Sequence, residues 1–306
     1  MTTALFIKRL FTYIIYSQYV ISSCKKNTDT IIPVTNNLVV PYAIGLKHTL
    51  PALLNESSGL CYTEGDLWSF GDSGNPNSIY KIDTTSGAIL QTVTIANYPN
   101  IDWEAITADS LYIYVGDTGN NNGNRKDLKV LRIKKTDMAS HSSPLSVNAE
   151  AINYSYSDQV DFSSNSNTNF DCEAIVAFRN NLYAFTKNRG DLETRCYRLP
   201  KNPGTYTVSP ISSFNTNGKI TDAAYDPITK ELALLGYMNQ KLDSFIWFFN
   251  GFPDDNFFSG ISSRLMFGNR SADWQTEGLD YLSTGRLMMT CETSASHVAS
   301  LYFFQK

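Results

Sequence analysis

Histidine is scarce in this 306-residue sequence, and positive charge does not dominate it. Only three histidines occur, His48, His141 and His297, so a metal site built from several imidazoles is nearly excluded. Charged residues make up 18% of the chain and the net charge is −4, which argues against a protein that holds a nucleic acid polymer by its phosphates. The hydrophobic share of 42% is too high for a disordered chain.

The apolar run near the N-terminus is too short for a transmembrane helix. Residues 10–21 are mostly apolar, whereas a spanning helix needs about 20 such residues. Lys8 and Arg9 precede this run, and the small residues Ser22 and Ser23 follow it. A basic start, a short apolar run and small residues before a cleavage point are typical of a secretory signal. We therefore predict a signal peptide over residues 1–23.

The tetrapeptide Ile21-Ser22-Ser23-Cys24 resembles the lipobox of bacterial lipoproteins. The resemblance implies that Cys24 is lipidated, by palmitate or similar chains, and becomes the first mature residue. The alternative is an ordinary signal peptide followed by a chance cysteine. Residue 25 is Lys, unlike the usual inner-membrane retention signal, so we expect a lipoprotein of the cell outer membrane. Acyl chains would hold it there, and the polar residues 24–39 would form a flexible tether.

The other four cysteines are expected to be buried free thiols. Each lies in an apolar, strand-like run without CxxC spacing, which favours free thiols although export would permit disulfides. They are Cys61, Cys172, Cys196 and Cys291.

Residues 40–306 repeat a short motif five times. In each copy the third residue is acidic or Ser, the fourth is Gly or Ala, and the fifth is apolar. The copies span residues 56–60, 102–106, 171–175, 220–224 and 275–279. Strand patterns follow each copy after a polar turn, and the 18 Tyr and 17 Phe also favour strands.

A repeat of roughly 50 residues with four strands is typical of a β-propeller. We predict an all-β propeller domain over residues 40–306, with five blades of four-stranded antiparallel sheets. A sixth blade is the alternative, because the second interval is long. The fourth strand of the third blade is expected at residues 206–211. The fifth repeat has only three strands, so an N-terminal strand near residues 41–49 should close the ring and leave no exposed edge.

The repeated third position is expected to form a ring, because the first strand of each propeller blade lies innermost. The ring residues are Ser58, Glu104, Glu173, Asp222 and Glu277. Carboxylates about 8 Å apart repel by roughly 2 kcal/mol per pair at an effective dielectric near 20. They must therefore take up protons, recruit Lys or Arg, or bind a cation.

Two interpretations of the ring stay open. Oxygen ligands without His or Cys favour Ca²⁺ over Zn²⁺, so the first interpretation is a calcium ion in the channel. In the second, the acids only accept backbone N–H bonds and hold neighbouring blades in register. Asp72, Asp117 and Lys187 end second strands near one rim, and Trp103 and Trp274 adjoin ring acids. These five residues are candidates for ligand contact.

The domain resembles bacterial lipoprotein propellers of the group that includes regucalcin/gluconolactonase-like and NHL-like propellers. In the gluconolactonase-like family, a Glu in a Glu-Gly-Pro context ligates a central divalent cation. Glu277-Gly278 and Glu104-Ala105 are similar to that context but lack the Pro. The resemblance implies a divalent cation in the channel.

A second resemblance is to calcium-activated nucleotidases of the apyrase type, which are five-bladed and ring a Ca²⁺ with Ser and Glu. Ser58, Glu104 and Glu173 are similar in context and order. Asp222 stands where that family has Ser, and the last ligand would be Glu277 or Glu292. These are the residues that the resemblance implies as a calcium shell.

Two functions are consistent with these observations. The first is a monomeric, lipid-anchored propeller that binds an unknown protein or small molecule on one rim, without catalysis. The second is a Ca²⁺-dependent hydrolase of a phosphate ester, nucleotide or lactone, in which the ion would polarise the substrate or activate water. The near-equal acids of the repeat favour the first, because catalysis needs an asymmetric set of groups.

Overall fold

The computed structural model describes residues 36–38, 44–140, 142–238, 243–267 and 274–306, with the backbone alone for 36–38, 46 and 47. The predicted signal peptide, Cys24 and most of the predicted tether lie outside the described residues, as does His141. In the described ranges no helix is both long and apolar enough to cross a membrane. Pro33–Lys306 forms one compact unit, and every described strand belongs to it.

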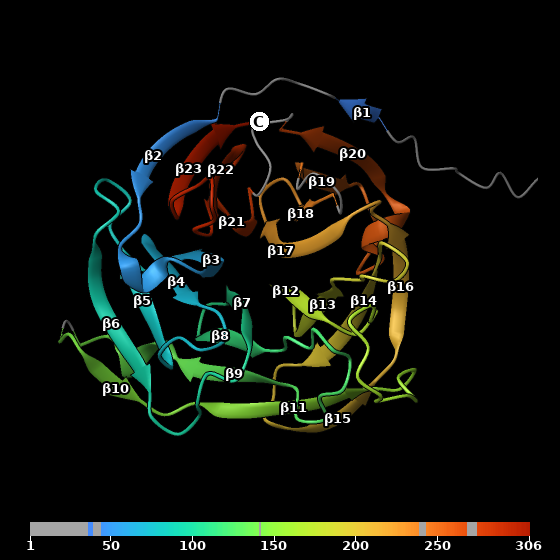
Figure 1. The fold of residues 1–306 in the computed structure, drawn as a ribbon, viewed down its shortest axis with the longest axis horizontal. Helices are drawn as coiled ribbons and strands as arrows, with labels where there is room; N and C mark the ends of the chain where they lie inside the picture. The colour runs from blue at the N-terminus through green and yellow to red at the C-terminus, as the bar shows by residue number, and fades with distance from the viewer. Residues whose placement is uncertain (1–35, 39–43, 141, 239–242, 268–273) are drawn as a thin grey trace, which may run out of the picture. The chain divides into compact units, whose positions relative to one another are not determined.

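Five sheets of mainly antiparallel strands form a five-bladed β-propeller (Figure 1). From the innermost strand outwards, the first blade contains β3 (Ser57–Thr63), β4 (Asp66–Gly71), β5 (Ser78–Ile82), β6 (Ile89–Ile95) and β10 (Leu145–Val147). The second contains β7 (Trp103–Ala108), β8 (Tyr112–Asp117), β9 (Lys129–Lys134), β11 (Glu150–Tyr156) and β15 (Gly204–Val208). The third contains β12 (Cys172–Phe178), β13 (Asn181–Thr186), β14 (Glu193–Pro200) and β16 (Pro210–Asn215).

The fourth and fifth blades combine both ends of the domain. The fourth contains β17 (Lys219–Asp226), β18 (Glu231–Tyr237), β19 (Ser244–Asn250), β20 (Ile261–Met266) and β1 (Asn36–Leu38). The fifth contains β21 (Thr276–Ser283), β22 (Arg286–Cys291), β23 (Ser300–Gln305) and β2 (Gly45–Thr49). Three short 3₁₀ helices complete the described elements: η1 (Ala52–Leu54), η2 (Lys135–Met138) and η3 (Phe257–Ser259).

The five innermost strands surround one channel. β3 lies beside β7, β7 beside β12, β12 beside β17, β17 beside β21, and β21 beside β3 (Figure 1). The predicted five-bladed fold is thus confirmed, and the long second interval contains no sixth blade. Because each inner strand begins at a copy of the repeated motif, the motifs meet at one end of the channel.

The predicted closure by an N-terminal strand is also confirmed. β2 pairs antiparallel with β23, with Thr49 opposite Ser300, so the fifth blade takes its outermost strand from the start of the domain. This pairing joins the two ends of the domain and covers an edge that would otherwise stay open.

Three blades have an outer strand that the sequence pattern did not predict. β1 pairs parallel with β20, β10 with β6, and β15 with β11. The fourth strand expected at residues 206–211 is wrong in part. Its first half belongs to β15, which crosses to the second blade, and the third blade ends with β16 instead. β1 lies within the predicted tether, before residue 40.

Hydrophobic side chains fill the space between neighbouring blades, and the cysteines take part in this core. One cluster joins Ile220 and Phe245 of the fourth blade to Phe185 and Cys196 of the third. Cys61, Cys172, Cys196 and Cys291 are all buried and free, as predicted.

Candidate functional site

A β-bulge lies at the same place in each inner strand. The pairing of β7 with β8 skips Glu104, that of β12 with β13 skips Glu173, and that of β21 with β22 skips Glu277. In β3 the skipped residues are Ser58 and Gly59. A bulge turns a side chain out of the alternation of its strand. The bulge therefore places these side chains in equivalent positions at the start of four of the inner strands.

We call the cluster at these strand starts the charged mouth. It consists of Glu56, Ser58, Asp72, Asp102, Glu104, Asp171, Glu173, Lys187, Arg189, Glu277 and Glu292. The charged members come from blades one, two, three and five, and their charges shift one another's pKa values. Ser58 is connected to them by a hydrogen bond to Glu104.

The ammonium of Lys187 lies among the buried acids of the charged mouth. It donates a hydrogen bond to Glu173 and lies 3.8 Å from the Glu277 carboxylate. Burial alone would lower the pKa of Lys187, but Glu173 and Glu277 outweigh burial and raise it. Burial raises the pKa of Glu173 to about 7 against the opposing effect of Lys187. The Glu277 Oε2 oxygen has no hydrogen-bond partner in the described part of the chain.

Glu104 is held by a hydroxyl rather than by a cation. Ser58 donates a hydrogen bond of 2.7 Å to Glu104 Oε2, which connects the first two blades. Burial, and then the charge of Glu173, raise the pKa of Glu104 well above its usual value. Two of the predicted ring residues thus contact each other directly.

One side of the charged mouth carries acids without a cationic partner. No Lys or Arg in the described ranges forms an ion pair with Glu56, Asp72 or Glu292. Burial raises the pKa of Asp72 to about 7, and Glu56 and Asp102 add to the effect. Burial raises the pKa of Glu292 to about 8, and Asp72 adds to it. Around neutral pH, Asp72 and Glu292 therefore retain protons for part of the time, because burial and neighbouring acids disfavour their charged forms.

The opposite side of the charged mouth is neutralised. Arg189 pairs with Asp171 at 2.9 Å. On the adjoining rim, Asp117 pairs with Arg125 at 2.8 Å and with Lys129 at 3.3 Å. Asp117, a predicted ligand residue, is therefore buried in an ion-pair network. The symmetry of the sequence repeat is broken, since one side has paired charges and the other has acids without an ion-pair partner among the described residues.

Asp222 makes a different set of contacts from the other predicted ring residues. In the fourth blade the residue that the bulge skips is Thr221, and Asp222 pairs with Leu235. Its carboxylate accepts the backbone N–H of Leu279 at 2.7 Å and of Leu60 at 3.3 Å. Burial raises its pKa, and these N–H groups oppose the rise. Asp222 thus connects three inner strands, which is the kind of contact that the second, structural interpretation describes.

The two tryptophans predicted near the channel are buried in packing contacts. Trp103 is 0% exposed and meets Phe70 edge-on at 6.2 Å. Trp274 is 2% exposed and meets Tyr302 edge-on at 5.4 Å. In these positions the indoles support the blades, and neither presents a face to a ligand.

The five predicted ring residues do not fit a calcium shell as they lie. The ammonium group of Lys187 lies between Glu173 and Glu277. The carboxylate of Asp222 already accepts hydrogen bonds from backbone N–H groups. Among the described residues, no group of three or more His, Cys, Asp or Glu is placed to hold a metal ion. Calcium in the channel stays a prediction.

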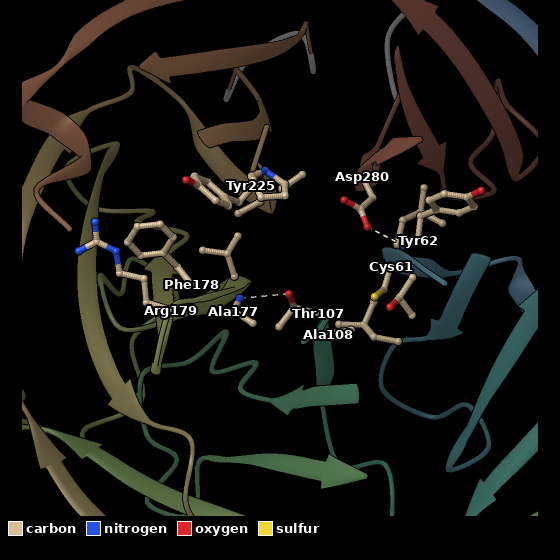
Figure 2. Close-up of a pocket in the computed structure, with 16 residues that line it drawn as sticks. Cys61, Tyr62, Thr107, Ala108, Ala177, Phe178, Arg179, Tyr225 and Asp280 are labelled. Atoms are coloured by element: carbon tan, nitrogen blue, oxygen red, sulfur yellow. Dashed lines mark hydrogen bonds between the residues drawn. The ribbon is translucent and has the colours of Figure 1, made fainter. Parts of the chain in front are cut away.

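A cavity of about 320 Å³ lies farther along the same inner strands. Figure 2 shows its lining residues, which come from all five inner strands and from the turns that follow two of them. Asp280 accepts the N–H of Tyr62 at 2.5 Å, and Thr107 accepts the N–H of Ala177 at 3.2 Å. These bonds connect neighbouring blades around the cavity.

Four residues of the charged mouth were not predicted to take part in a site: Glu56, Asp102, Asp171 and Arg189. Acids also recur at the first position of the motif, at Glu56, Asp102 and Asp171, and this regularity could have revealed them. Arg189 and Lys187 follow the second strand of the third blade. Hairpin register places Thr186 opposite Cys172, so Lys187 could have been aligned with the start of its inner strand.

Comparisons with known proteins support the fold and no closer relationship. No family model and no curated protein matches the chain. An exo-β-1,3-galactanase from Phanerochaete chrysosporium, solved with galactose, is 11% identical with a TM-score of 0.50, over 88% of this chain and 64% of that one. A putative oxidoreductase (glucose dehydrogenase) from Thermus thermophilus is 8% identical with a TM-score of 0.44, over 85% and 99%.

The hydrazine synthase of Kuenenia stuttgartiensis is 12% identical with a TM-score of 0.39, over 84% of this chain. The chain spans 64% of the length of the synthase and galactanase chains. The similarity to the galactanase, at 11% identity, indicates a similar fold and nothing further. The chain is a five-bladed β-propeller.

Proposed function

We propose that this protein is a lipid-anchored propeller outside the cytoplasm that binds a positively charged ligand or partner at the charged mouth. One observation carries the proposal: Glu56, Asp72 and Glu292 cluster without an ion-pair partner in the described chain, and two of them have raised pKa values. An incoming cation would replace the protons on Asp72 and Glu292. The gain is larger than at an exposed acid, because a partly desolvated charge pair is poorly screened.

The neutralised side of the charged mouth would fix the geometry of the site. Lys187, Arg189 and Arg125 are each paired with an acid, so they hold Glu173, Asp171 and Asp117 in place without attracting an anion. The Oε2 oxygen of Glu277 offers a further acceptor. This asymmetric set suits one ligand in one orientation.

Binding would be tested by calorimetry with two probes, Ca²⁺ and an acetylated tetra-arginine peptide. We expect saturable binding of at least one probe, weakened tenfold or more in Glu292→Gln. The matched control is Asp254→Asn, which also removes one negative charge but lies at a side chain that is 82% exposed. Equal binding by wild type and Glu292→Gln, or no binding of either probe, would contradict the proposal.

A hydrolase is the second candidate, and two carboxyl groups that titrate near neutral pH favour it. Carboxyl groups with a pKa of about 7 and about 8, at Asp72 and Glu292, can give and take protons at the pH where an enzyme works. Hydrolysis of nucleoside diphosphates or lactones would be measured with and without Ca²⁺. Activity that disappears in both Asp72→Asn and Glu292→Gln supports catalysis, and activity retained in both removes these acids from it.

The membrane anchor rests on the N-terminal sequence alone. Labelling with radioactive palmitate should mark the wild-type protein and not Cys24→Ser. Unlabelled wild type would leave a secreted propeller with an ordinary signal peptide.

A further inference from the structure

The cavity at the far ends of the inner strands has both polar and apolar walls. Leu60, Ile106, Val176 and Ala223 line it, with Thr107 and Cys61 beside them. Its volume of about 320 Å³ is in the range of sites for small molecules. No residue of the charged mouth lines it, so an occupant here is independent of the function proposed above.

Asp280 is the single acid among the residues that line the cavity. Figure 2 shows its carboxyl group at the edge of the open space, opposite Phe178 and Tyr225. The N–H groups of Tyr62 and Tyr281 bond to its two oxygens, at 2.5 Å and 2.7 Å. A carboxylate offers about four acceptor sites, so these bonds leave acceptor capacity on the side that faces the cavity.

The one basic residue of the lining is turned away from the cavity. The guanidinium of Arg179 lies 5.0 Å from the centre of the Phe178 ring and pairs with Asp254 at 3.1 Å. Figure 2 shows it pointing outwards. The acidic group that faces the interior is thus the carboxyl group of Asp280, and burial raises its pKa to about 7.

We propose that this cavity binds a small primary amine with an aliphatic body, whose ammonium group pairs with Asp280. A cation leaves water for a buried site only when a counter-charge and hydrogen-bond acceptors meet it, and the carboxyl group of Asp280 supplies both once it has released its proton. The rings of Phe178 and Tyr225, which lie across the cavity from Asp280 (Figure 2), would contact the alkyl chain. The same chemistry occurs in a free amine and at the N-terminus of a peptide that begins with leucine.

The test compares three ligands of one shape by calorimetry: 3-methylbutylamine, 3-methylbutanol and 3-methylbutanoate. We expect the amine to bind at least tenfold more tightly than the alcohol, and the acid to bind least. Asp280→Asn should abolish the preference for the amine and keep the weak binding of the alcohol. Asp137→Asn removes an exposed charge outside the cavity and should keep the preference.

A second variant separates loss of folding from loss of the site. Ala108→Leu narrows the cavity without touching Asp280, and should weaken the binding of amine and alcohol alike. Leu-Gly-Gly and its N-acetylated form distinguish a peptide from a free amine as the natural source. Equal affinity of wild type for amine and alcohol, or no binding of either, would overturn the proposal.

Discussion

The ammonium of Lys187 bonds to the carboxylate of Glu173 across the first hairpin of the third blade, with both side chains buried. Glu277 of the fifth blade lies 3.8 Å from the same ammonium. A single lysine thus connects acids that are far apart in the sequence. Two effects reduce the repulsion between the acids of the ring: the positive charge of Lys187, and raised pKa values that keep some of the acids protonated.

Replacing Lys187 by Met should strongly destabilise the protein. The change leaves Glu173 and Glu277 as buried acids without their cation, and breaking a buried pair in this way costs about 3–5 kcal/mol. Urea unfolding at pH 8 measures the loss. The control is Lys81→Met, which breaks the more exposed ion pair with Asp66 and should cost about 0–1 kcal/mol. Similar losses in the two variants would mean that Lys187 does not neutralise the acids.

The stability of the protein should fall as the pH rises from about 5 to about 8. The pKa of Glu292 is raised to about 8 and that of Asp72 to about 7 in the folded chain, so the folded state binds more protons than the unfolded state in this range. A raised acid pKa therefore gives a free energy of unfolding that decreases with pH. Glu292→Gln should flatten the decrease, as measured by urea unfolding at one-unit steps of pH. An unchanged slope would show that Glu292 titrates normally.

Adding a single methyl group at Gly119 should destabilise the protein. A Cβ atom there would lie 2.3 Å from Asp102 Oδ2 and 2.8 Å from Glu104 Cγ, so Gly119→Ala must displace both acids. We expect a loss of about 1–3 kcal/mol together with weaker binding of the cationic probe. Gly45→Ala, where nothing lies within 4 Å of the added atom, should change stability by less than about 0.5 kcal/mol. Identical behaviour of the two variants would contradict the crowding at Gly119.

Asp222 is expected to hold blades together rather than bind a ligand. Asp222→Ala leaves the N–H groups of Leu60 and Leu279 without an acceptor. The free energy of unfolding should fall by about 1–3 kcal/mol for each unsatisfied group. Asp222→Asn retains an acceptor oxygen and should lose less. The melting temperature of each variant, measured in Ca²⁺ and in EDTA, separates the two interpretations of this residue. A loss seen only in Ca²⁺ would make Asp222 a metal ligand.

The blade number and the ring closure could be predicted from the sequence because the motif recurs and the last repeat lacks a strand. The parallel outer strands could not. The alternation of residues 204–208 indicates a strand but not the sheet that it joins, and β15 leaves its own blade to pair with β11. That choice depends on contacts between blades, which sequence patterns do not reveal.

The candidate site was predicted in part for a similar reason. The motif identified Ser58, Glu104, Glu173 and Glu277, which the bulges make equivalent. It misaligned Asp222 by one residue, because the bulge skips Thr221 and a bulge leaves no mark in a five-residue pattern. The cation that pairs with Glu173 lies across a hairpin, so only strand register connects the two.

The most direct test of the charged mouth is the number of protons released when a cation binds. Calorimetric titration with Ca²⁺ or acetylated tetra-arginine at pH 7, in two buffers with different ionisation enthalpies, gives that number. Protonated Asp72 and Glu292 must lose their protons as the cation arrives, so we predict net release that shrinks in Glu292→Gln. Binding without proton release, or no binding at all, would contradict a cation site formed by these acids.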